Sequence, residues 1–405
     1  MNANHVRWSM NKKKAAVLFL PICLFIIISA AEIGVAAAQL KPDQLHSYLR
    51  QGIEKVFNLE PQNASTYLQK AVDLDRENPT GYAFLGLANL FFYEISLDQK
   101  EREKYQESMF GYVSEAAAKG QSRIEKNPND GRAYFALAMA KIIKVRWAIG
   151  QKQWRVVAQE TSNVWDYLEK AKKEDPQNYD TYFLMGLLHY HLDHLPPVAR
   201  FFSSLLITSG DTKKGLQELE LAAQKGDLLK ELAQSELASV YVSFEKQPAR
   251  ALPIARELKK RFPRNYNFSF ALANALSEVH QSQEAFATAR EIEKGIQAGT
   301  PPFVPQLQPR LDLLMGRIFF NEGEYARASE YLEKTLKDKA PYNARVRARA
   351  LVYLGMIHDA LKERKQAEDC YNRALAEKGG EGLAQVEARK YLDSPYVPPP
   401  KPQSR

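Results

Sequence analysis

The stretch that decides the fold is residues 351–374, LVYLGMIHDALKERKQAEDCYNRA. Its apolar and small residues recur three and four positions apart, which is the spacing of one face of an α-helix. Gly355 lies in the first half, Ala367 follows 12 positions later, and Tyr371 lies one turn beyond it. Small residues allow two backbones to approach closely, so the stretch predicts two helices packed against each other, with Glu363 and Lys365 on the solvated side.

The same pattern recurs along the chain. Residues 312–332, DLLMGRIFFNEGEYARASEYL, repeat it closely, and weaker copies open at Tyr82, Tyr134 and Tyr182. Four pairs of small residues share the 12-position separation: Gly52 and Ala64, Ala273 and Ala285, Gly316 and Ala328, and Gly355 and Ala367. A single helix pair cannot bury its apolar face, whereas a stack of pairs can. The repeats therefore predict one continuous core in place of separate domains.

On these motifs the sequence resembles the tetratricopeptide repeat (TPR) proteins over most of residues 45–376. The resemblance implies an all-α fold, a right-handed α-solenoid of about eight stacked helix–turn–helix units. It also implies a role in binding a protein or peptide. The glycines Gly86 and Gly186 are expected at close helix approaches, like Gly52, Gly316 and Gly355, and not in a phosphate-binding loop.

The spacing of the units is irregular. The units open at Tyr48, Tyr82, Tyr134, Tyr182, Gln234, Ser269, Asp312 and Leu351, against a standard period of about 34 residues. Three consecutive units are enlarged, which predicts insertions at 90–115, 141–163 and 189–214 within units 1–6 (45–294). Because neighbouring units stack in register, we expect the insertions to emerge on one edge of the solenoid.

Aromatic and arginine residues gather in the insertions. The candidates for partner binding are Phe91, Phe92, Arg146, Trp147, Trp154, Arg155, Phe201 and Phe202. One interpretation is that the aromatic rings pack the lengthened helices together. The other is an exposed ridge that binds a partner, because aromatic and arginine side chains dominate interface energetics. Basic and aromatic residues together also suit an anionic membrane surface, but they are sparse here.

The C-terminal part divides into further segments. Residues 295–310 contain Gly295, Gly299 and four prolines, and are expected to form a linker. Units 7–8 follow at 311–376. Residues 377–394 are expected to form a capping helix, since a repeat array needs its last face covered. Residues 395–405 contain five prolines and predict an extended, disordered tail.

The N-terminal segment indicates export. Arg7 and three consecutive lysines precede an uncharged apolar run, and Ala36-Ala37-Ala38 follow it. This order is typical of a secretory signal peptide cleaved after Ala38, which predicts a periplasmic protein or one at the outer face of the cytoplasmic membrane. An uncleaved membrane anchor and a buried N-terminal helix are the alternatives, and the anchor would keep the chain at the membrane.

Composition and motifs exclude several classes of protein. Hydrophobic residues make up 45% and charged residues 26% of the 405 positions, which are globular values. The net charge of +8 falls to +5 without residues 1–38, which weakens the case for nucleic acid. No catalytic motif and no cofactor-binding motif is present, so we expect a protein that is not an enzyme. His191 and His194 are the only candidates for a metal site, and we expect none, because two ligands on one helix face do not complete a site.

These observations favour a non-enzymatic, exported scaffold that binds a protein or peptide in the cell envelope. The alternative is a ligand-handling accessory of an envelope transporter, with the insertions at Phe91–Phe110 and Phe201–Phe202 lining an apolar pore or cavity.

N-terminal sequencing tests the export prediction. Protein isolated from the exported fraction should begin at Gln39, because the small residues before it match the specificity of signal peptidase. A chain that still begins at Met1 would favour the membrane anchor.

Overall fold

The computed structural model describes residues 43–161, 163–192, 210–380 and 382–398. In these ranges the regular structure is helical and contains no strand. The first helix spans 43–57, and the others are α2 (Pro61–Leu74), α3 (Pro79–Ile95), α4 (Gln99–Lys126), α5 (Gly131–Gly150), α6 (Trp154–Thr161), α7 (Val164–Glu174), α8 (Asp180–Leu192), α10 (Thr212–Lys225), α11 (Lys230–Ser243), α12 (Pro248–Arg261), α13 (Tyr266–Glu278), α14 (Ser282–Ala298), α15 (Gln308–Asn321), α16 (Tyr325–Lys337), α17 (Ala344–Ala360), α18 (Arg364–Ala376) and α19 (Leu383–Asp393), with 3₁₀ turns η1 (Pro305–Leu307) and η2 (Pro341–Asn343).

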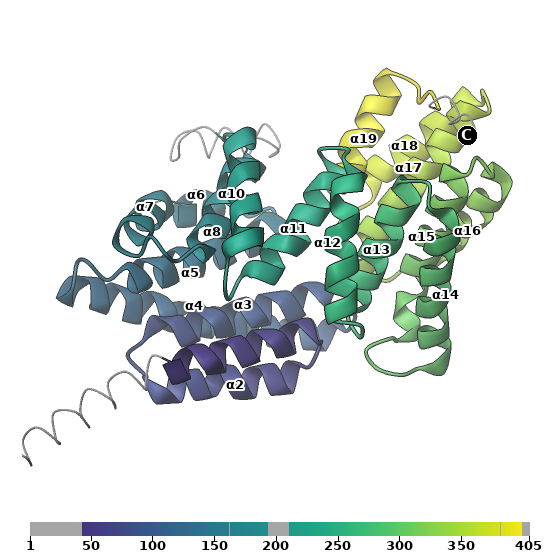
Figure 1. Cartoon of the computed structure of the whole chain (residues 1–405). Coiled ribbons are helices and arrows are strands. Elements are labelled where there is room, and N and C mark those ends of the chain that lie inside the picture. Colours follow the sequence, from purple (N-terminus) through teal and green to yellow (C-terminus); the bar gives the residue numbers. More distant parts are fainter. Residues whose placement is uncertain (1–42, 162, 193–209, 381, 399–405) are drawn as a thin grey trace, which may run out of the picture.

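Consecutive helices pack as pairs, and each pair packs on the next. α3 packs on α4, α8 on α10, α15 on α16 and α17 on α18, and each pair adjoins the following one (Figure 1). The expected all-α architecture of stacked helix pairs is confirmed. The predicted signal segment 1–38 and residues 399–405 lie outside the described residues, and in the part described no helix is both long and apolar enough to span a bilayer.

The glycines mark where the two helices of a pair cross. A methyl group at Gly52 would lie 2.5 Å from Leu68, and one at Gly316 would lie 2.8 Å from Leu332. The contact at Gly355 is closer still, 2.3 Å from the ring of Tyr371. In each of these three pairs the contacting side chain comes 16 positions after the glycine. That is one helical turn beyond the small residue that follows the glycine by 12 positions in the sequence repeat. Ala328 and Ala367 are fully buried at the same crossings.

The enlarged units use the same crossing with longer helices. Gly86 meets Val113 and Gly186 meets Leu219, which lie 27 and 33 positions later. The first enlargement appears as helices of 17 and 28 residues, α3 and α4. The second is a 20-residue α5 followed by the short α6, and Asn163 in a left-handed conformation separates α6 from α7. The third includes residues 193–209, outside the described ranges.

Two segments of the C-terminal part differ from expectation. The linker is shorter than 295–310, because α14 continues to Ala298 and η1 and α15 take up 305–310. The tail is docked where it begins. The Tyr396 N–H donates to Asp359 Oδ2 at 2.8 Å, and its ring packs on Phe320 and Tyr391. Tyr396 has this partner because Asp359 is buried and has acceptor capacity left beyond Tyr371 and Arg364.

The core is less continuous than the repeats predict. One large cluster runs from Leu45 to Ile318 and crosses the linker through Leu307. Two smaller clusters follow it, one around Phe319 and Leu354 and one around Tyr371, which α19 covers as a cap.

The first helix packs on residues far along the chain. Phe57 is 1% exposed, and its ring centroid lies 5.3 Å from that of Phe262 and 6.1 Å from that of Phe268. Asn265 Nδ2 donates to the Phe57 carbonyl oxygen at 2.8 Å, and the Tyr266 hydroxyl donates to the Ile95 carbonyl oxygen at 3.3 Å. In a simple solenoid each unit contacts only its neighbours, so this contact was not predicted.

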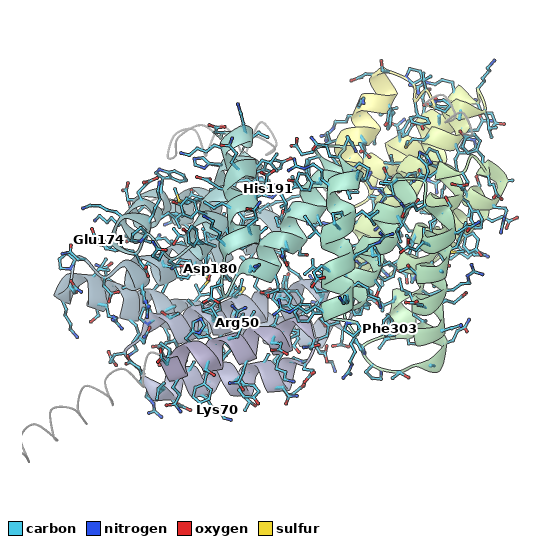
Figure 2. All side chains as sticks on the ribbon, viewed as in Figure 1. Arg50, Lys70, Glu174, Asp180, His191 and Phe303 are labelled. Carbon is cyan, nitrogen blue, oxygen red and sulfur yellow. The ribbon has the colours of Figure 1, made fainter. Side chains whose placement is uncertain are left out.

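Charged residues line one side of this contact. His46 and Arg50 both pair with Asp227, in the turn before α11. Glu231 is 1% exposed and lies between Arg50 and Arg261. Figure 2 shows Arg50 at the boundary between the N-terminal helices and the later ones. We call these ion pairs, together with the contacts of Phe57, Asn265 and Tyr266, the clasp.

The crossing at Gly355 can be tested by substitution. Gly355→Ala should lower the free energy of unfolding by about 1–3 kcal/mol, because the added methyl group collides with the rigid ring of Tyr371. Urea unfolding followed by circular dichroism measures the change.

Gly111→Ala is the matched control. Gly111 is an exposed residue inside α4 with open space around it, so the substitution should stabilise the protein by about 0.5–1 kcal/mol through helix propensity. Equal effects of the two substitutions would contradict the crossing.

Candidate functional site

The phenylalanines predicted to form a ridge face the interior. Phe92 is 5% exposed and packs on Tyr105. Phe91 is partly buried and contacts Phe57 and Phe92 edge-on. An anchor must be accessible to its partner, so the expected binding role of Phe92 is wrong. These rings fill space between helices, which is the packing interpretation of the first insertion. Phe201 and Phe202 lie outside the described residues.

The second insertion is partly internal as well. The Trp147 ring meets Phe110 edge-on at 4.8 Å, and its Nε1 donates to Gln106 Oε1 at 3.2 Å. Arg146 forms a bidentate pair with Glu94, at 2.7 and 3.0 Å.

Trp154 packs in a small cluster with Val145, Ala148 and Val157, while Arg155 is exposed. Trp154 and Arg155 therefore keep accessible surface, but the six candidates that the structure describes do not form one ridge.

The histidines of α8 have carboxylate partners. His191 Nε2 lies 2.8 Å from Glu236 Oε1, and buried His189 lies 2.5 Å from Glu218 and edge-on to Trp165. His194 lies outside the described residues. Within the described ranges no group of three or more histidine, cysteine or acidic side chains could hold a metal ion. Cys370 is buried, and burial raises its pKa to about 11, so the thiol is protonated at neutral pH.

A groove on the first helices of the last three units is the better candidate. It lies along α13, α15 and α17 and has a volume of about 180 Å³. We call it the arginine groove. Its lining residues are Phe270, Asn274, Arg310, Leu313, Leu314, Arg317, Arg345, Val346, Arg349 and Tyr353.

Helix periodicity brings the arginines into this groove. Arg310 and Arg317 are seven positions apart on α15, and Arg345 and Arg349 are four apart on α17, so each pair shares a helix face. α13 packs on α15 and α15 on α17, which aligns these faces.

Arg310 has no carboxylate partner among the described residues. Its guanidinium lies 4.2 Å from the ring centroid of Phe270, and its Nη1 donates to Asn267 Oδ1 at 2.6 Å. Burial lowers the pKa of Arg310, since the surroundings penalise its charge without a compensating acid. The buried Nδ2 of Asn267 also has no hydrogen-bond partner there. Asn267 and Phe270 therefore hold in place a guanidinium that lines the groove and suits an anion.

The other arginines differ in how far they are neutralised. Arg317 donates to Glu278 and Asn274, and Arg349 pairs with Glu387 of α19. Burial opposes the charge of Glu278, but Arg317 and Asn321 more than offset it, so the pKa of Glu278 lies below its usual value.

Exposed Arg345 has no ion pair within the ranges described. Four arginines against two carboxylates leave the groove positively charged.

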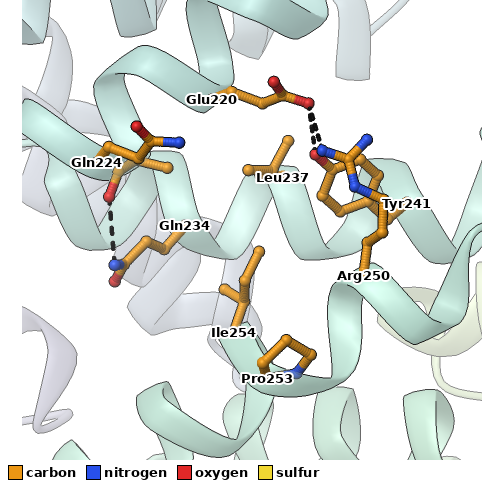
Figure 3. Close-up of a pocket in the computed structure, with 9 residues that line it drawn as sticks. Glu220, Gln224, Gln234, Leu237, Tyr241, Arg250, Pro253 and Ile254 are labelled. Carbon is orange, nitrogen blue, oxygen red and sulfur yellow. Dashed lines mark hydrogen bonds and ion pairs between the residues drawn. The ribbon is translucent and has the colours of Figure 1, made fainter.

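A second cavity, of about 410 Å³, lies between α10, α11 and α12. Figure 3 shows Glu220 at one end, where it accepts hydrogen bonds from Tyr241 and Arg250, with Gln224 and Gln234 at the other. Its charged groups, Glu220 and Arg250, pair with each other. This cavity therefore leaves fewer charged groups for a ligand than the arginine groove does.

Sequence reasoning missed the arginine groove. It treated charged residues as the solvated outside of the units and searched the insertions for a site. The signal was present, because arginines recur at helical spacing in the opening helices of units 7 and 8. Recognising it requires knowing which helix face the stack leaves uncovered.

Comparisons with known proteins leave the function open. No protein-family model matches the chain, and no curated protein matches it. Among solved structures it is similar to a human IFIT1 dimer with m7Gppp-AAAA (13% identity, 87% of each chain covered, TM-score 0.43). It is also similar to yeast Tom70 (12% identity, 92% of this chain and 86% of that chain, TM-score 0.38) and to the TPR domain of P58(IPK) (11% identity, 86% and 97%, TM-score 0.22). At these identities and TM-scores, a partner has to be argued from the groove itself.

Replacing Trp147 distinguishes packing from partner binding. Trp147→Ala should destabilise the protein by about 3 kcal/mol, because it leaves a void beside Phe110 and removes the hydrogen bond to Gln106. Urea unfolding measures the loss, and Arg155→Ala, at an exposed position, should change stability by less than about 0.5 kcal/mol. Unchanged stability of the Trp147 variant would restore the ridge hypothesis.

Proposed function

We propose that the chain is a non-enzymatic, exported scaffold of about eight TPR-like units. Its arginine groove would bind an extended, acidic segment of a partner protein in the cell envelope. The order of basic, apolar and small residues in 1–38, which is typical of a signal peptide, supports the location, and the recurrence of helix pairs supports the class of protein.

One observation supports the choice of groove. Arg310 is a partly buried guanidinium held in place by Asn267 and Phe270, and no acid in the described part of the chain neutralises it. Burying a charge costs free energy unless an opposite charge approaches, so an acidic ligand gains more here than at an ordinary surface arginine. Exposed Arg345 adds a second positive charge at the groove.

The apolar residues of the groove favour a protein over a nucleic acid. Leu313, Leu314 and Val346 line it between the arginines, and these side chains suit apolar side chains of a peptide. Sequence-tolerant binding of single strands uses aromatic platforms along a basic channel, whereas two of the four arginines here are already paired with acids.

The groove can be tested with defined peptides. A fluorescein-labelled octapeptide that alternates glutamate with leucine should bind the full-length chain, and the corresponding lysine–leucine octapeptide should not. In the double variant Arg310→Gln, Arg345→Gln the affinity should fall at least tenfold, because each charged hydrogen bond contributes about 1.5–3 kcal/mol. Fluorescence anisotropy measures the affinity, and Arg155→Gln, which removes one exposed positive charge outside the groove, is the control.

Three results would contradict the proposal. They are equal binding of the acidic and basic peptides, unchanged affinity in the double variant, and tighter binding of an oligouridine than of the acidic peptide. The last result would assign the groove to nucleic acid.

A further inference from the structure

Three consecutive residues at the start of α13 connect the clasp with the arginine groove. Asn265 donates to the Phe57 carbonyl oxygen, and Tyr266 donates to the Ile95 carbonyl oxygen, so both belong to the clasp. Asn267 accepts a hydrogen bond at 2.6 Å from Arg310, which lines the groove. The Tyr266 ring also lies below the Arg310 guanidinium, 5.9 Å from ring centroid to the central carbon. A change in the clasp therefore reaches Arg310 through one turn of helix.

Asn265 performs two tasks with one amide group. Its side chain is fully buried, and its Oδ1 accepts from the Asn267 N–H at 3.0 Å, which caps α13. Its Nδ2 donates to Phe57 in the first helix. Since a buried donor without a partner destabilises the fold, the position of α13's first turn depends on Phe57 staying in place.

The rim of the clasp is accessible to solvent. His46 and Asp227 have half-exposed side chains, and ion pairs of this kind stabilise a contact only slightly. The buried side chains of Phe57, Asn265 and Glu231 lie behind this rim and become exposed when the clasp opens.

We propose that the closed clasp holds the first turn of α13 in the position at which Asn267 orients Arg310 to bind the acidic segment. Opening the clasp weakens that binding. The first helix is then a regulatory element of the groove, and this inference rests on the proposed function.

Two sets of variants open the clasp from different sides. Asn265→Asp keeps the capping oxygen of α13 but removes the donor to Phe57. Asn78→Asp is its matched control, because Asn78 caps α3 in the same way by accepting from the Thr80 N–H and has no part in the clasp. His46→Gln with Arg50→Gln removes the charged rim and leaves α13 unchanged.

Two measurements on the full-length chain separate opening from binding. Hydrogen exchange of residues 43–57 should accelerate at least tenfold in Asn265→Asp and in the rim variant, and it should not change in Asn78→Asp. Affinity for the glutamate–leucine octapeptide should fall at least fivefold in the two clasp variants and less than twofold in the control.

Each contrary result overturns the inference. Unchanged exchange in both clasp variants would show that the clasp does not open separately. Faster exchange with affinity within twofold of the wild type would show that the groove is independent of it. If the wild type itself binds no acidic peptide, the proposed function fails along with the coupling, and the wild-type measurement distinguishes that failure from the other two.

Discussion

The helix pairs depend on a close crossing of their two helices at a small residue, and where that residue is glycine there is no room for a side chain. At Gly52, Gly316 and Gly355 an added methyl group would lie within 3 Å of a buried side chain of the second helix. Such an approach lets each pair bury apolar residues between its helices and still present apolar residues to the next pair. Because successive pairs stack in the same orientation, their first helices expose equivalent faces, and arginines on those faces form one groove.

The clasp changes how this stack is held together. In an open array the total stability is the sum of the stability of each unit and of each interface between neighbouring units. A unit at the end of such an array has a neighbour on one side only. Here the first helix is held by α2 on one side and by Phe262, Asn265 and Glu231 on the other. The end that would otherwise fray is fixed, and the large core cluster continues from Leu45 to Ile318.

The sequence was sufficient for the helix pairs because their determinants are local. The glycine, the alanine 12 positions later and the aromatic residue beyond it all lie within one unit, and helix periodicity follows directly from them. Which residues remain exposed on the stacked helices could not be predicted in this way. Trp147 and Arg146 look like interface residues, and only the positions of Gln106, Phe110 and Glu94, 37 to 52 residues earlier, show that they are internally satisfied. The clasp pairs Phe57 with Asn265, and no short-range pattern marks that contact.

The clasp also determines the order in which the chain can fold. Phe57 and Asn265 are 208 positions apart, whereas the helix pairs form between residues a few tens of positions apart. Closing so long a loop costs entropy that the local pairs do not have to overcome, so it comes after them. In a chain that appears N-terminus first, the helix at 43–57 is made before the others but reaches its final position only when α13 exists. Until then Phe57 remains uncovered on one side, where a chaperone of the unfolded chain could bind it.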